Sequence, residues 1–196
     1  IIGIASSATF GAVIAYLLKL PEFFYGIVAF ICCMVSTLLI FKISKRGNKI
    51  EVNTLLIVGI TLSSFLAGFT SFAIYMIGED SFKITMWLMG YLGNASWNQI
   101  VFLIIPLIFS SAYFYAKRNE LDILMLGDEQ AHSLGIDIAK LKFHLLIVSS
   151  FVVAYSVAFT GMIGFVGLIV PHIMRSMIGP LNAKLIPLVL IYGGIF

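Results

Sequence analysis

The chain has 196 residues, of which 61% are hydrophobic and 11% charged, and its formal net charge is +3. Soluble domains are roughly 45–50% apolar and about 25% charged. The 12 basic and 9 acidic residues here are too few to cover the surface of such a domain. This composition excludes a soluble enzyme, a nucleic-acid-binding protein and a disordered chain, and it indicates an integral membrane protein. The two cysteines, Cys32 and Cys33, are adjacent in an apolar run and cannot form a disulfide framework.

Long apolar runs dominate the chain, and each is expected to be a membrane-spanning helix. Backbone polar groups in hydrocarbon must be paired within the segment, and these runs lack the alternation of barrel strands. Because the first residue is not Met and the last apolar run is shorter than a span, we expect an internal piece of a longer polytopic chain. The expected spans are residues 1–18, 23–41, 52–77, 99–116, 143–160 and 162–178, with a seventh starting at Leu185.

A shorter apolar run covers residues 84–92 and is too short to cross a bilayer. It contains Trp87 and Tyr91 and is followed by Trp97. Aromatic residues of this kind gather at membrane interfaces, so the run predicts an interfacial or re-entrant helix.

The basic residues fix the expected orientation. Alternating the spans leaves only Lys19 and Lys83 on one side and places all the other basic residues on the opposite side, which is therefore expected to be cytoplasmic. The first and third spans then run outward. The residues on the cytoplasmic side are Lys42, Lys45, Arg46, Lys49, Lys117, Arg118, Lys140, Lys142, Arg175 and Lys184.

The acidic residues all lie in loops or at helix ends, and none is placed in the middle of a span. Carriers coupled to protons or sodium usually keep ionisable groups near the bilayer midplane, where they act as the coupling device. We therefore expect either a different source of driving energy or passive conduction.

The longest polar tract, residues 117–142, contains a predicted short helix bounded by Gly127 and Gly135. Asp128 and Glu129 fall in its first turn, where the helix dipole favours anions, and Gly135 falls where a left-handed residue often ends a helix.

Leu126, Gln130 and Leu134 share one face of this predicted helix, and Ala131 beside them would let another backbone approach closely. Two interpretations are open: an amphipathic connector on the membrane surface, or a docking element for a cytoplasmic partner. The few basic residues in the segment favour docking over lipid attraction.

A second unusual segment runs from residue 161 to 175 and is rich in glycine. Pro171 crowds the carbonyl of Gly167, which predicts a kinked helix, and the glycines would share one side for close packing. His172 could bind a metal, but neither His132 nor His144 completes a ligand set, so a hydrogen-bonded structural histidine is favoured.

These two segments, in this order, resemble the permease subunits of the ABC importers for ferric siderophores, haem and cobalamin. Residues 127–135 are similar to the family's G-[ED]-x-x-A-x-x-L-G element, and residues 161–175 to its G-x-I-G-F-[IV]-G-L-x-[IV]-P-H-x-x-R element. Residues 87–90 look like its W-x-x-G segment. The resemblance implies an all-α polytopic membrane bundle of ten helices, of which residues 1–196 would be the third through the start of the ninth. The resemblance further implies that residues 1–196 are one permease domain truncated at both ends, with residues 117–142 as a cytoplasmic coupling segment.

The resemblance also implies roles for three groups of residues. The coupling element, which would fit a cleft in a cytoplasmic ATPase, comprises Gly127, Asp128, Glu129, Ala131, Leu134 and Gly135. A gate at Val52, Asn53 and Thr54 would begin a pathway-lining helix that continues through Gly59, Ser63, Ala67 and Ser71; tight helix packing remains an equal interpretation of that small-residue stripe. The structural motif comprises Gly161, Gly164, Phe165, Gly167, Pro171, His172 and Arg175.

The function implied is a non-enzymatic permease subunit of an ATP-driven importer, moving a ferric siderophore or a similar iron, haem or cobalamin chelate across the cytoplasmic membrane. The expected partners are a second permease subunit, identical or not, two ATPases that bind ATP and magnesium, and an external substrate-binding protein. The chain itself is expected to bind no cofactor, metal or nucleic acid. Lys19 and Lys83 are the visible external basic residues that could meet the binding protein.

Three alternatives remain at this stage. A secondary carrier or passive channel would transport without an ATPase. A membrane-embedded enzyme would need a catalytic cluster such as an HExxH pair or paired intramembrane carboxylates, which the sequence lacks. A permease for bare divalent metals fits the motifs less well than a chelate permease.

Overall fold

Helices account for nearly all of the regular structure. The computed structural model describes residues 3–21, 23–46, 49–78, 81–90, 97–161, 163 and 165–195. Within these residues, one short antiparallel hairpin, β1 (Lys45–Arg46) with β2 (Lys49–Ile50), accompanies the helices and pairs Lys45 with Ile50. The helices are α1 (Ile4–Leu17), α2 (Phe23–Ser44), α3 (Val52–Ile77), α4 (Ser81–Leu88), α5 (Trp97–Ala116), α6 (Arg118–Leu124), α7 (Asp128–Ser133), α8 (Ile138–Thr160), α9 (Val166–Ile178) and α10 (Asn182–Ile195). The predicted all-α bundle is confirmed.

Four of these helices, α2, α3, α5 and α8, are long and apolar enough to cross a membrane. They coincide with four of the expected spans. The first expected span forms only the 14-residue α1, and the predicted short aromatic helix is α4, which begins before residue 84 and ends before Gly90. Tyr91 lies outside the described residues. The last helix, α10, begins at Asn182, before the predicted start at Leu185.

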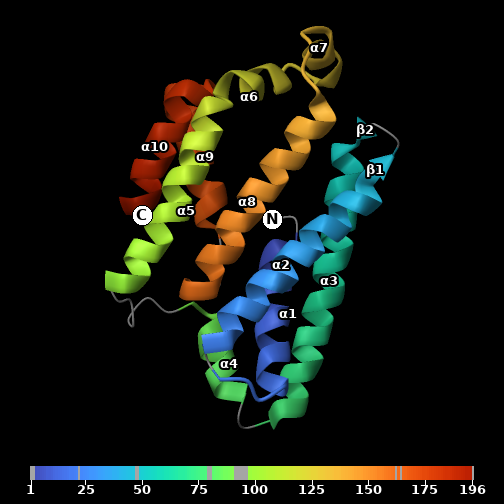
Figure 1. The fold of residues 1–196 in the computed structure, drawn as a ribbon, viewed down its shortest axis with the longest axis vertical. Helices are drawn as coiled ribbons and strands as arrows, with labels where there is room; N and C mark the ends of the chain where they lie inside the picture. The colour runs from blue at the N-terminus through green and yellow to red at the C-terminus, as the bar shows by residue number, and fades with distance from the viewer. Residues whose placement is uncertain are drawn as a thin grey trace.

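The basic segments gather at one end of the bundle. Figure 1 shows β1–β2, α6 and α7 together at the top, whereas α4 and the α1–α2 connection lie at the bottom. We call the end formed by β1–β2, α6 and α7 the basic end. Lys19, which follows α1, lies at the opposite end. The arrangement agrees with the alternation of spans expected from the charges.

Small residues let α1, α2 and α8 pack closely. A Cβ atom on Gly11 would stand 2.7 Å from the Cα of Ala29 in α2, and one on Gly26 would stand 2.8 Å from the carbonyl oxygen of Ala158 in α8. Ala154 of α8 is fully buried in the same cluster as Ala29. Close backbone approach of this kind gains dispersion contacts that hydrocarbon tails cannot supply.

Helices α9 and α10 pack on each other through Val170, Met174 and Leu185, apart from that cluster. Helix α10 is also held at its first residue, because Asp122 Oδ1 in α6 accepts hydrogen bonds from the backbone N–H of Asn182 at 2.9 Å and from its Nδ2 at 2.6 Å. This link joins the basic end of α10 to α6.

The predicted helix through residues 162–178 is wrong in its first part. Helix α8 ends at Thr160, Gly161 has φ 69°, Phe165 has φ 65°, and α9 begins only at Val166. The 23-residue α8 is about 35 Å long and α9, with 13 residues, about 20 Å. Since α8 starts and α9 ends at the basic end (Figure 1), α9 begins well short of the far end of α8.

The three glycines therefore do not form one helix face. Gly161 caps α8, whereas Gly167 is exposed in the first turn of α9 with no described atom within 4 Å of a Cβ placed on it. Gly164 lies outside the described residues. The physical reason is that α8 already has the length of a span at Thr160, and a left-handed glycine allows the chain to turn there. Pro171 lies inside α9 as predicted.

The contact at Gly11 gives a direct test of the packing. We expect Gly11→Ala to lower the stability of the full-length protein by about 1–3 kcal/mol, because the new methyl meets backbone that cannot rotate away. Gly68→Ala in α3 is the matched control, since a Cβ there meets no described atom within 4 Å. Melting temperatures in detergent measure both variants. Equal melting temperatures for the two would contradict this packing.

Candidate functional site

Helix α7 stands at the extremity of the basic end, beyond the membrane-length helices (Figure 1). It begins after Gly127, which has φ 119°, and it ends before Gly135, which has φ 82°. The Gly135 N–H donates to the carbonyl of His132, and the Ile136 N–H donates to that of Ala131. This pair of bonds is the Schellman arrangement that ends helices at a left-handed glycine. The predicted glycine-bounded helix is confirmed.

Every residue of α7 except Ala131 is exposed, and together with the flanking Leu126 and Leu134 these residues make up what we call its open face. Leu126 and Leu134 are 65% and 63% exposed, and Gln130 between them is exposed. Glu129 of the first turn is exposed as well. Large apolar side chains held in the open next to polar ones form the kind of mixed surface that protein partners cover.

Ala131 was expected to let another backbone approach closely, and its part in coupling stays a prediction. Its side chain is fully buried within the chain, so it does not offer a partner a place of close approach. A six-residue helix must still bury one side against its own protein, and the small Ala131 serves that inner side of α7. The open face consists of longer side chains.

An ion pair joins α7 to the start of α8. Lys142 Nζ lies 2.9 Å from Asp128 Oδ1 and 2.6 Å from Oδ2, and it donates to both. The Lys142 side chain is 10% exposed and that of Asp128 53%. Lys142 was not among the expected site residues. A basic residue near the start of a span carried no signal beyond orientation.

The other ion pairs of the described residues at this end are local. Lys117 pairs with Glu120 at 2.8 Å and Lys140 with Asp137 at 3.1 Å, each within one helical turn. Asp137 also caps α8, and the hydrogen bond from the Lys140 backbone N–H, followed by that from its side chain, holds the pKa of the Asp137 carboxyl below its usual range. Exposed pairs of this kind add little to stability.

The residues expected to line a pathway divide into two groups along α3. Gly59 and Ser63 lie against α1, where a Cβ on Gly3 would stand 2.7 Å from Ser63 Oγ, whereas Ala67 and Ser71 are exposed. A four-residue spacing drifts around a helix of 3.6 residues per turn, so the stripe starts on the packed side and leaves it.

The expected gate residues form the first turn of α3, which starts at the basic end (Figure 1). Val52 and Asn53 are exposed there, and Thr54 Oγ1 donates to Glu51 Oε2 at 2.9 Å. The first turn of this apolar helix is therefore open at the same end of the bundle as α7.

The predicted hydrogen bond of His172 is not formed among the described residues, where His172 is exposed on α9, as is Arg175. The face that α9 buries carries Val170 and Met174 instead. Across the part of the chain that the structure describes, no group of three or more His, Cys, Asp or Glu residues is placed to hold a metal ion. The expectation that the chain binds no metal stays a prediction.

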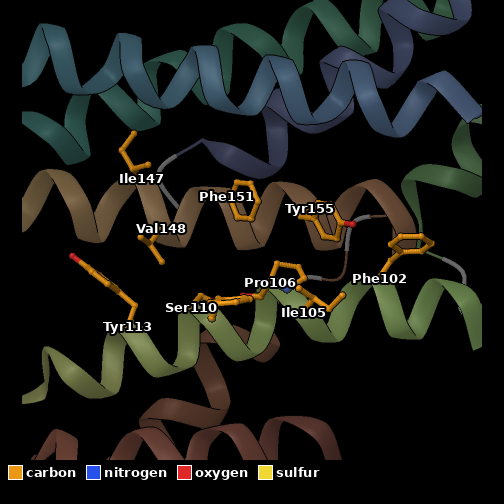
Figure 2. A pocket seen from close by; sticks show the side chains of 10 residues that line it. Phe102, Ile105, Pro106, Ser110, Tyr113, Ile147, Val148, Phe151 and Tyr155 are labelled. Atoms are coloured by element: carbon orange, nitrogen blue, oxygen red, sulfur yellow. The ribbon is translucent and has the colours of Figure 1, made fainter.

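An open apolar groove of about 550 Å³ runs between α5 and α8. Figure 2 shows Tyr113 and Pro106 on α5, and Phe151 and Tyr155 on α8, among the side chains that line it. The groove could not be predicted from the sequence, because the neighbours of an evenly apolar helix determine which of its faces is left uncovered.

The chain is similar to known transport proteins over its whole length. The model of the FecCD transport family matches residues 1–196. A cobalamin import system permease of Halobacterium salinarum is 35% identical, with the match covering 100% of this chain and 53% of that protein. A hemin transport system permease of Yersinia pestis is 29% identical over 95% of this chain and 58% of that protein. A molybdate import system permease of Haemophilus influenzae is 29% identical over 100% of this chain and 59% of that protein.

The fold has a solved counterpart. A structure described as an inward-facing conformation of a metal-chelate type ABC transporter superposes with a TM-score of 0.89 at 27% identity, covering 98% of this chain and 62% of that one. The chain thus spans between about half and three-fifths of the length of these relatives. With its family model matched from the first residue to the last, the chain belongs to the FecCD transport family.

Proposed function

We propose that this chain forms the membrane-spanning part of a permease in an ATP-driven importer, and that α7 docks onto a cytoplasmic ATPase. The observation that carries the proposal is the open face of α7, with Leu126 and Leu134 exposed at the outermost point of the basic end. Membership in the FecCD transport family supports it, as do the relatives named as import permeases. A surface connector lying on lipid would instead turn these two leucines into the bilayer.

The orientation follows from charge. The basic end carries most of the basic residues, and the positive-inside rule places such an end in the cytoplasm. The chain then resides in the cytoplasmic membrane with α7 facing the compartment that holds ATP. Lys19 and α4 face outward, where an extracytoplasmic binding protein delivers the cargo.

The cargo is proposed to be a bulky chelate such as a ferric siderophore, haem or a corrinoid. Relatives named for cobalamin and hemin support this class. Helix α3 carries no charged residue from Val52 to Ile77, and its exposed face offers hydroxyl and apolar side chains. A wall without charges suits the passage of a large chelate better than the coordination of a bare ion.

The proposed mechanism is alternating access in an assembly of two permease subunits and two ATPases. ATP and magnesium bind to the ATPases, whose closure displaces α7, and hydrolysis takes place there rather than in this chain. The displacement rearranges the membrane helices, including α3, whose first turn at Val52 opens or closes the inner end of the path. Such coupling needs a mechanical link between α7 and the bundle.

Leu134→Glu tests the docking surface. Removing an exposed leucine from the centre of an interface and adding a charge weakens binding, so we expect the amount of ATPase that co-purifies with the full-length permease to fall at least about tenfold. The rate of ATP hydrolysis by the assembled transporter is expected to fall as well. Both are measured on the detergent-purified complex.

Leu18→Glu is the matched control, because Leu18 is 66% exposed at the opposite end of the bundle. It leaves ATPase binding unchanged. Normal ATPase binding by Leu134→Glu, or substrate uptake by the permease alone in liposomes without any ATPase, contradicts the proposal and favours a secondary carrier or channel.

Cysteine labelling tests the path along α3. The two native cysteines are first removed by Cys32→Ala and Cys33→Ser. Cys33 Sγ donates to the Ile4 carbonyl at 3.1 Å, and the serine hydroxyl keeps a donor at that position. A cysteine replacing the exposed Ser71 is expected to react with a charged thiol reagent at least about tenfold faster than one replacing the packed Ser63. ATP changes the first rate and not the second. Equal rates at the two positions, or no reaction at position 71, remove Ser71 from the path.

A further inference from the structure

The ion pair between Lys142 and Asp128 differs from the other ion pairs of the described residues. The side chain of Lys142 is 10% exposed, against 37% for Lys117 and 78% for Lys140. Lys142 reaches both carboxylate oxygens of a residue 14 positions away, whereas the other two pairs close within one turn of their own chain. This pair is therefore a connection between elements, shielded on the lysine side.

Because the Lys142 side chain is shielded from water, separating this ion pair is unfavourable. Parting the two charges leaves an ammonium group with little water around it, which costs far more than parting an exposed pair. Charge-assisted bonds to both carboxylate oxygens also restrict the direction in which Asp128 lies from Lys142. The pair therefore holds the two elements together at a defined angle.

Asp128 lies where the ion pair can orient α7. Asp128 is the first residue of α7, directly after Gly127 with its φ of 119°. The inner face of α7 carries the fully buried Ala131, whose single methyl group offers little shape to fix the rotation of a short helix. The carboxylate bonded to Lys142 supplies a directional contact there.

Lys142 connects the ion pair to the membrane-length helix α8. Lys142 lies near the start of α8, a single helix that continues without interruption to Thr160. Farther along, α8 packs tightly on α2 where Gly26 meets Ala158, and it ends at the left-handed Gly161 before the chain turns toward α9. A force applied to Asp128 is thus delivered to a helix of membrane length that ends at Gly161.

We propose that the Asp128–Lys142 pair is the connection by which displacement of α7 is passed to α8, with Lys142 as a positioning residue. The inference rests on the proposed function, since it assumes that an ATPase displaces α7. The hydrogen bonds from Asn182 to Asp122 hold α6 to α10 instead, so they anchor the tract without touching α7.

The test uses the full-length transporter with its ATPase, reconstituted in lipid discs. A nitroxide spin label is attached to a cysteine replacing Ile163, which is 52% exposed and lies just beyond α8, in a chain with Cys32→Ala and Cys33→Ser. The spectrum is recorded before and after adding ATP with vanadate. Co-purification of the ATPase and its rate of hydrolysis are measured on the same samples, so the readout needs no identified cargo.

Lys142→Met keeps most of the length of the side chain and removes its charge, and Lys142→Arg keeps the charge. We expect Lys142→Met to retain ATPase binding within about twofold while the ATP-dependent spectral change shrinks at least about fivefold. Lys142→Arg retains most of the change. Lys140→Met is the matched control, because Lys140 is two positions away, exposed, and paired within α8 itself, and it behaves as the unsubstituted chain. Lys142→Gln takes the place of Lys142→Met if that variant does not fold, as judged by its yield in detergent.

A full spectral change in Lys142→Met, or in Lys142→Gln where it takes its place, with the ATPase bound overturns the inference and leaves the proposed function standing. Loss of ATPase binding in Lys142→Met but not in Lys140→Met also overturns it, because the pair then belongs to the docking surface. An unsubstituted chain that binds the ATPase and shows no ATP-dependent change at position 163 excludes α8 as the route. A chain that binds no ATPase overturns the proposed function itself.

Discussion

Two carboxylates hold the polar tract at the basic end to different membrane helices. Asp122 accepts hydrogen bonds from the first residue of α10, and Asp128 pairs with Lys142 in α8. Because both partners are fixed in long or well-packed helices, α6 and α7 have a set position although α7 has only six residues. A helix so short would not persist in water by itself. Its persistence and its direction therefore come from these links and from its two flanking glycines, and the open face with Leu126 and Leu134 is a consequence of that fixed direction.

Helix α8 has a central place in this arrangement. It packs against α2 through small residues and aromatic rings, with Phe151 5.5 Å from Phe30 between ring centroids, and it borders α5 across the apolar groove. At its start it carries Lys142, and at its end it meets the break that separates it from α9. Because α8 contains neither proline nor glycine, which are common causes of kinks, we expect it to move as a unit. Because α8 ends at Thr160 and α9 begins only at Val166, the two are separate helices.

Much of the fold could be predicted from the sequence because the bilayer imposes simple demands. Apolar runs of sufficient length gave four of the spans, and the distribution of lysine and arginine gave the end at which α7 lies. The glycines around α7 were informative because Gly127 and Gly135 sit where helix ends require positive φ. The break after α8 was missed, since Gly161 reads the same in a sequence whether it packs a helix or ends one. Its role depends on α8 having reached the far side of the bundle.

The site was predicted less completely than the fold. Leu126 and Leu134 are exposed as the predicted face requires, although both flank α7 and Gly127, with φ 119°, interrupts the helical spacing of Leu126. The burial of Ala131 was not predicted, because a six-residue helix gives too little periodicity to tell its two sides apart. The Asp128–Lys142 pair joins residues of two elements across a turn, and charge counting cannot match such partners. The small-residue stripe on α3 does not stay on one side of the helix. Each four-residue step exceeds the 3.6 residues of a turn, so Ser71 points in a different direction from Ser63.

The central proposal is that α7 and the exposed leucines that flank it, Leu126 and Leu134, are covered by a separate ATPase. Hydrogen exchange of backbone amides, measured by mass spectrometry on the full-length permease with and without that ATPase, tests it most directly. The account predicts that exchange in residues 125–135 slows at least about tenfold when the ATPase is bound, while exchange in α4 at the opposite end is unchanged. Unaltered exchange in residues 125–135 within a complex that demonstrably contains the ATPase would contradict it.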